Sequence, residues 1–124
     1  MQRQLEMLYG MSRLAFGAGL IAAPGEMGSL LLDKRAQKPA VRIFARSYGT
    51  RDTVTGIGML AAVATGSDTR PWLAAAVLSD LLDVAIQVSE WDELPPEKRL
   101  PGIGSALGAG LVGLALLARS DSGE

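Results

Sequence analysis

Charged side chains inside apolar stretches are the groups of this sequence best placed to do chemistry. Three arginines and three aspartates share this setting: Arg13, Arg46, Arg51, Asp52, Asp80 and Asp83. Glu6 adds a fourth carboxylate, so the two signs nearly balance. Because an unpaired buried charge is prohibitively costly, this balance predicts a paired guanidinium–carboxylate network. Such a network would either lock helices into one register or form a site for a small polar or lipid ligand.

Other catalytic chemistry is scarce in the chain. Its 124 residues include no His and no Cys, which excludes disulfides, zinc fingers, cysteine nucleophiles and histidine bases. The net charge of −1 offers no basic field for nucleic acid. Asp80 and Asp83, one helical turn apart, could ligate a hard cation such as Mg²⁺, but the neighbouring arginines argue against it. We therefore expect no metal and no cofactor, and an enzyme acting on membrane lipids is the least supported class.

Proline and glycine residues divide the chain into four long apolar stretches. These stretches are rich in Ala, Leu and Gly, lack the alternation of β-strands and contain few β-branched residues. They predict helices over residues 5–23, 40–65, 72–91 and 100–118. Short connections between four helices favour an up-down arrangement. We therefore expect an all-α four-helix bundle that occupies residues 1–124 as a single domain.

The helical period places the charged side chains on matching faces. In the first predicted helix Arg13 shares a face with Glu6 and with two glycines, and in the third Asp80 shares a face with Asp83. When the first two helices are folded about the midpoint of their connection, Arg13 comes level with Gly49. Because charge that faces lipid is costly, the polar faces should meet inside the bundle.

The last apolar stretch indicates a membrane protein. Residues 100–118 contain no charge, and a span needs about 20 predominantly apolar residues. Glycines weaken helices in water but let membrane helices approach closely, so we expect Gly104, Gly108 and Gly110 to pack against a neighbouring helix. Trp72 and Trp91 bracket the third helix, as indoles at both membrane interfaces do. The alternative is a soluble Ala-rich four-helix bundle, which the charges of the other three stretches favour.

The basic residues predict an orientation. The first and third connections hold five of them, against three on the other side: Lys34, Arg35, Lys38, Lys98 and Arg99 against Arg3, Arg70 and Arg119. Because basic loops stay in the cytoplasm, we expect both termini outside a bacterial inner (cell) membrane. Nine arginines against three lysines, with abundant Ala and Gly, are typical of a bacterial genome rich in G and C.

Three short motifs carry a family resemblance. They are Arg13-Leu-Ala-Phe-Gly17, Arg46-Ser-Tyr-Gly-Thr-Arg-Asp52 and Asp80-Leu-Leu-Asp83. With these motifs the chain resembles small four-span bacterial membrane proteins of unknown function, loosely of the DoxX-like type. The resemblance implies a multi-pass membrane protein and no established activity.

Besides catalysis, two classes of function remain open for such a protein in a lipid bilayer. The first is an assembly or accessory subunit of a larger membrane complex, or a homo-oligomer, held by the buried Arg/Asp network; the smooth last helix favours it. The second is a binder or carrier of a small polar or lipid ligand at the same network. Substitution of Arg51 or Asp83 separates the two, because a binder would keep its fold and lose its ligand.

Overall fold

The computed structural model describes residues 1–121, and every regular element in this range is helical. The elements follow in the order α1 (Gln2–Ala22), α2 (Pro24–Leu31), the short 3₁₀ helix η1 (Lys34–Gln37), α3 (Pro39–Thr65), α4 (Arg70–Ser89), the 3₁₀ helix η2 (Trp91–Glu93) and α5 (Pro96–Asp121). The prediction of an all-α fold is confirmed. Five α-helices, however, stand where the sequence predicted four.

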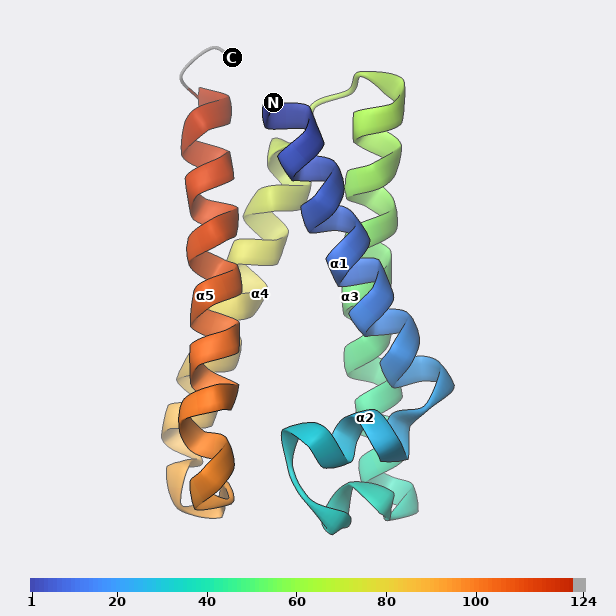
Figure 1. The fold of residues 1–124 in the computed structure, drawn as a ribbon, viewed down its shortest axis with the longest axis vertical. Coiled ribbons are helices and arrows are strands. Elements are labelled where there is room, and N and C mark those ends of the chain that lie inside the picture. The colour runs from blue at the N-terminus through green and yellow to red at the C-terminus, as the bar shows by residue number, and fades with distance from the viewer. Residues whose placement is uncertain (122–124) are drawn as a thin grey trace.

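Helix α2 is the element that the sequence analysis missed. Pro24 occupies its first turn, where the missing amide proton costs nothing because the first N–H groups of a helix lack partners anyway. The same proline keeps the preceding residue out of the helical region, so α1 ends at Ala22. α2 leaves α1 at an angle of 115° and runs across one end of the bundle (Figure 1). Pro24 therefore begins a helix as well as ending one.

The four long helices alternate in direction. Figure 1 shows the start of α1 and the end of α5 at one end of the bundle, which we call the terminal end. α2 and η1 lie at the opposite end, which we call the α2 end. α1 packs extensively against α3, and α4 against α5, whereas the two pairs contact each other much less. The fold is thus two helix pairs that meet along part of their length.

Glycines hold α1 and α3 at backbone contact. A β-carbon on Gly17 would stand 2.5 Å from the carbonyl oxygen of Gly49, and one on Gly56 would stand 2.7 Å from the carbonyl oxygen of Gly10. Both distances are too short for real atoms, so only glycine fits at these crossings. Two helical turns separate the glycines within each helix, which lets the antiparallel helices meet at both places. This register sets the depth of every other side chain on the two helices.

At the terminal end, side chains from all four long helices form a core. Its buried members are Tyr9, Met59, Leu73, Ala76 and Leu116. Beside this core the Glu6 carboxylate accepts hydrogen bonds from Gln2 Nε2 at 2.9 Å and from Ser120 Oγ at 3.2 Å. Because Ser120 belongs to α5, this contact ties the first helix to the last. The two helix pairs are therefore in contact at this end, with an open groove between α1 and α5 beside the core.

Two of the helices, α4 and α5, are long and apolar enough to cross a membrane. The bent pair of α1 and α2 makes a third candidate if it is one span. α3 has the length of a span, but Arg51 and Asp52 near its middle lower its mean hydropathy. The sequence predicted four membrane-spanning helices. By length and composition, two or three of them are long and apolar enough to cross a membrane.

Candidate functional site

Arg13 of α1 joins two carboxylates from two other helices. Its Nη1 donates to Asp52 Oδ1 of α3 at 2.9 Å, and its Nη2 donates to Asp80 Oδ2 of α4. Nη2 also donates to the hydroxyl of Tyr9, one turn earlier on α1, at 3.2 Å. Arg13, Asp52 and Asp80 are 7%, 5% and 6% exposed. Because all three charged groups are almost fully buried, their mutual pairing must replace the hydration that they lose.

Arg51 and Asp83 form a second ion pair next to the first. The Arg51 guanidinium donates to both oxygens of Asp83, at 3.1 Å and 2.8 Å, in the two-pronged geometry that suits a carboxylate best. The Tyr48 hydroxyl donates to Asp83 Oδ2 at 2.6 Å, and the guanidinium lies 4.1 Å from the centre of the Tyr48 ring. Both carboxylate oxygens of Asp83 therefore accept hydrogen bonds from side chains of α3.

Helix geometry explains why the two ion pairs are neighbours. Arg51 and Asp52 are consecutive on α3, so they point about 100° apart, one towards Asp83 and the other towards Arg13. Asp80 and Asp83 are one turn apart on α4 and face the same side. Arg51 Nε lies 3.9 Å from Asp52 Oδ1 and links the pairs. Three carboxylates therefore meet two guanidinium groups, which leaves one negative charge in excess.

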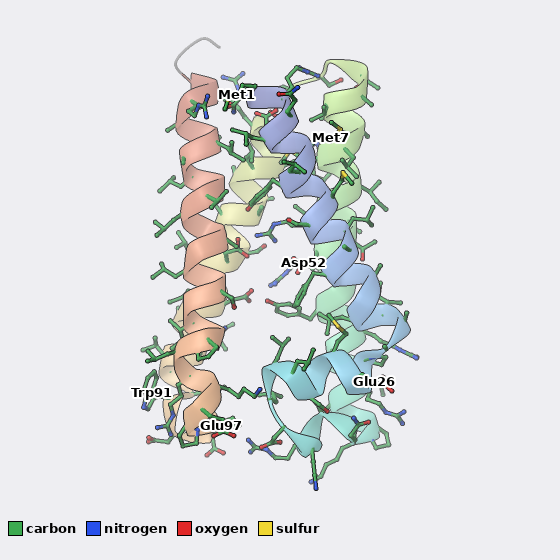
Figure 2. All side chains as sticks on the ribbon, viewed as in Figure 1. Met1, Met7, Glu26, Asp52, Trp91 and Glu97 are labelled. Carbon is green, nitrogen blue, oxygen red and sulfur yellow. The ribbon has the colours of Figure 1, made fainter. Side chains whose placement is uncertain are left out.

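A cavity of about 460 Å³ extends from this network towards the α2 end. Its walls are mainly apolar and come from α1, α3 and α5, while α2 and η1 close it with Gly28, Leu31 and Ala36. Arg13, Asp52 and Asp80 line its inner end; Figure 2 shows Asp52 between the two helix pairs. The volume falls in the range of about 300–1,000 Å³ that is usual for small-molecule sites.

The cavity reaches exposed positions on both α1 and α5. Ser12 of α1 and Ser105 of α5 line it and are exposed. Each lies about one turn towards the α2 end from the point where the Tyr9 hydroxyl approaches the Ala109 carbonyl oxygen at 3.5 Å. Both exposed positions therefore lie on the α2 side of that contact.

Five of the six residues expected in the polar cluster lie together, and Arg46 does not. The Arg46 Nε donates to the carbonyl oxygen of Ile21 at 3.1 Å, and its side chain is exposed. The glycine register between α1 and α3 places Arg46 opposite the last turn of α1, beyond the reach of Asp52. Arg46 therefore donates a hydrogen bond to a free carbonyl group in the last turn of α1 and does not join the network.

Of the three glycines of α5 that we expected to pack against a neighbouring helix, only Gly110 does so within the described part of the chain. A β-carbon on Gly104 or Gly108 would meet no atom within 4 Å in the described part of the chain. Gly110 does face α4, where its β-carbon would stand 3.3 Å from Asp80 Cβ. The closest approach on this helix is at Gly113, whose β-carbon would stand 2.7 Å from the Tyr9 hydroxyl. Any helix that packs on Gly104 and Gly108 would have to come from another molecule.

Two tyrosines belong to the site and were not expected from the sequence. Tyr9 precedes Arg13 by four residues, and Tyr48 precedes Arg51 by three. Both spacings place the ring and the guanidinium on one helix face, and this is the signal that could have found them. The Arg13 guanidinium lies 5.1 Å from the centre of the Tyr9 ring.

Within residues 1–121, no group of three or more acidic side chains is arranged to hold a metal ion.

Comparison with known proteins finds no match to a family model, a curated protein or a solved structure.

Proposed function

We propose that the protein is a membrane-spanning helix bundle that binds one amphiphilic molecule between its two helix pairs. The observation that carries this proposal is the junction of a largely apolar cavity with a buried charged network at its inner end. An amphiphile has matching parts: its hydrocarbon body buries against the walls, and its polar group reaches the network. The exposed cavity residues Ser12 and Ser105 support entry of such a molecule from the bilayer, between α1 and α5.

The distribution of side chains supports membrane insertion of the whole bundle. Each long helix exposes large apolar side chains, for example Leu8, Ile57, Leu78 and Leu111, all more than half exposed. The charged groups of the network are buried instead. Large exposed apolar surfaces are unfavourable in water and favourable in lipid. Charged groups are costly in contact with lipid, so in a membrane they are expected inside the bundle. The proposal therefore includes α3 as a span, with Arg51 and Asp52 facing the interior.

The proposal places the α2 end in the cytoplasm of a bacterial cell. Lys34, Arg35, Lys38, Lys98 and Arg99 all belong to this end and favour it as the cytoplasmic side. α2 would then lie along the inner membrane surface, and both termini would lie outside. A bundle with four helices across the bilayer would agree with the resemblance to small DoxX-like four-span proteins.

Native mass spectrometry of the detergent-purified chain with dodecanol tests ligand binding. An uncharged probe is chosen so that the result depends on the cavity and not on charge. We expect one retained dodecanol per chain. Ala106→Trp should abolish retention, because Ala106 lines the cavity and an indole would fill it. Leu107→Trp is the matched control, because the neighbouring residue on α5 does not line the cavity and is 40% exposed.

Two results would contradict the binding proposal. One is the absence of retained dodecanol from the wild-type chain. The other is equal retention in both tryptophan variants, which would place the bound molecule outside the cavity, for example in the groove between α1 and α5 at the terminal end.

A second candidate is assembly through α5, and the open face at Gly104 and Gly108 favours it. Another membrane subunit, or a second copy of the chain, would pack there. Gly108→Leu should then remove crosslinked oligomers from native membranes without loss of the monomer's fold. Unchanged crosslinking would exclude this face as an interface.

A further inference from the structure

The charge balance at the inner end of the cavity defines which polar group fits there. Arg51 and Asp83 neutralise each other and do not line the cavity. The charged groups of the network that do line it are Arg13, Asp52 and Asp80. One guanidinium therefore faces two carboxylates across the cavity end, and one negative charge stays uncompensated. A buried excess charge is costly, so the site favours a partner that removes it.

The hydrogen bonds identify which atoms await that partner. Asp52 uses Oδ1 and Asp80 uses Oδ2 to accept from Arg13. Within residues 1–121, neither Asp52 Oδ2 nor Asp80 Oδ1 receives a hydrogen bond. An ionised carboxylate is an acceptor only, so a matching group must donate. Both oxygens are accessible from the cavity, whereas the unpartnered atoms of the network that are fully buried are Arg13 Nε and Arg51 Nε, which a ligand in the cavity does not reach.

The other cation of the cavity is too distant to supply the charge. Lys98 lines the cavity near its α2 end and is half-buried. It precedes Gly110, which lies beside Asp80, by twelve residues on α5, or about 18 Å of helix. Lys98 thus places a donor at the outer end of the cavity and leaves the inner excess charge unchanged.

We infer that, if the proposed amphiphile site exists, its ligand carries a protonated amine. The ammonium lies between Asp52 and Asp80 and donates N–H bonds to their free oxygens, while its hydrocarbon chain occupies the apolar walls. An anion would face two carboxylates and is rejected. A quaternary ammonium neutralises the charge but has no N–H to donate, so it binds more weakly than a primary amine.

Competition among amphiphiles of one chain length tests the inference. The full chain is equilibrated with equal concentrations of dodecylamine, dodecanol, dodecyltrimethylammonium and dodecyl sulfate, and the retained species is identified by native mass spectrometry. We expect dodecylamine to be retained over dodecanol by about tenfold or more, since hydrogen bonds between charged groups contribute about 1.5–3 kcal/mol. Dodecyl sulfate should be the weakest.

Asp52→Asn provides the matched change within the site. It removes the excess charge and leaves the Arg13–Asp80 pair in place. The variant should therefore retain dodecylamine no better than dodecanol. Glu6→Gln is the control, because it removes another buried carboxylate outside the cavity and should keep the preference.

The outcomes separate this inference from the proposed function. Preference for dodecylamine that is lost only in Asp52→Asn supports the inference. Equal retention of dodecylamine and dodecanol, or equal retention of the primary and quaternary amines, overturns it while the amphiphile site stands. Retention of none of the four overturns both. The wild-type series decides between these outcomes even if Asp52→Asn does not fold.

Discussion

The two ends of the bundle are built from the same four long helices, yet the terminal end has an apolar core beside an open groove between α1 and α5, whereas the α2 end has the cavity. At the terminal end, Tyr9, Met59 and Leu73 pack together between the helix pairs. At the α2 end, many of the facing positions carry small side chains, including Ala45 and Ala106 on opposite walls. The buried ion pairs lie between the core and the cavity.

This difference shows how one bundle combines stability with an open site. Apolar packing at the terminal end holds the helix pairs together, so the α2 end does not have to. The ion pairs then fix the relative position of the pairs at the edge of the cavity, because Arg13 and Arg51 contact α4 through Asp80 and Asp83. Substitutions should therefore have effects that depend on which end they touch.

Loss of the central guanidinium should have the largest effect. Arg13→Met keeps much of the side-chain volume but leaves Asp52 and Asp80 buried without a cation. We expect a loss of about 3–5 kcal/mol in the free energy of unfolding, measured by titration with a denaturing detergent. Arg46→Met is the control, because this exposed arginine should change stability by less than about 0.5 kcal/mol. Equal effects of the two substitutions would mean that the network does not hold the helix pairs together.

Deletion of a large side chain should distinguish the terminal core from the cavity. Met59 is fully buried in the terminal core, so Met59→Ala should cost about 2–5 kcal/mol in the free energy of unfolding. Phe44 lines the cavity and is 74% exposed, so Phe44→Ala should cost less than about 1 kcal/mol. Thermal unfolding of both variants in one detergent gives the comparison. A larger cost for Phe44→Ala would mean that the α2 end is packed in the membrane.

The glycines of α5 should respond to alanine with opposite signs. At Gly113 a β-carbon would stand 2.7 Å from the Tyr9 hydroxyl and 2.9 Å from Val77 Cγ2, so Gly113→Ala should destabilise by about 1–3 kcal/mol. At Gly108 a β-carbon meets open space, so Gly108→Ala should stabilise the helix by about 0.5–1 kcal/mol. Unfolding in detergent measures both changes. Stabilisation at both positions would show that α5 does not approach α1 at Tyr9.

Two exposed aspartates before helix starts, Asp33 and Asp68, should have the smallest effects, and the two effects should be alike. Asp33 accepts a hydrogen bond from the backbone of Arg35 at the α2 end, and Asp68 accepts one from Arg70 at the terminal end. The side-chain hydrogen bonds of these arginines lower the pKa of each carboxyl. Each therefore stabilises the fold above the usual aspartate pKa, about 3.9, and this contribution is lost as the pH falls through the lowered value.

The matched variants Asp33→Asn and Asp68→Asn should each remove this part of the acid sensitivity. The unfolding temperature is measured as a function of pH for both. A much larger effect at one end would mean that its cap supports more than the local turn.

Much of the helical fold was readable from the sequence, but the positions between helices were not. Long apolar stretches and the helical period predicted the long helices and the faces that carry Arg13, Asp80 and Asp83. Periodicity, however, does not set the register between helices. The folded hairpin placed Arg13 level with Gly49, whereas α2 intervenes and Arg13 pairs with Asp52.

The same limit explains the glycines and the tyrosines. Small residues four apart mark a face on which a helix can approach, but they do not say whether a helix of the same chain does so, as Gly104 and Gly108 show. Tyr9 and Tyr48 join the site because they stand one turn from an arginine, a relation that matters only once the arginine is known to be buried.

Cysteine accessibility tests most directly the claim that the α2 end has a cavity and the terminal end a packed core. The natural chain has no cysteine, so Ala106→Cys in the cavity wall and Ala76→Cys in the terminal core can each be introduced alone. Membranes that contain either variant are treated with N-ethylmaleimide, with and without dodecylamine. We predict that Ala106→Cys is alkylated and is protected by dodecylamine, while Ala76→Cys stays unmodified. Equal alkylation at both positions, or none at Ala106→Cys, would contradict it.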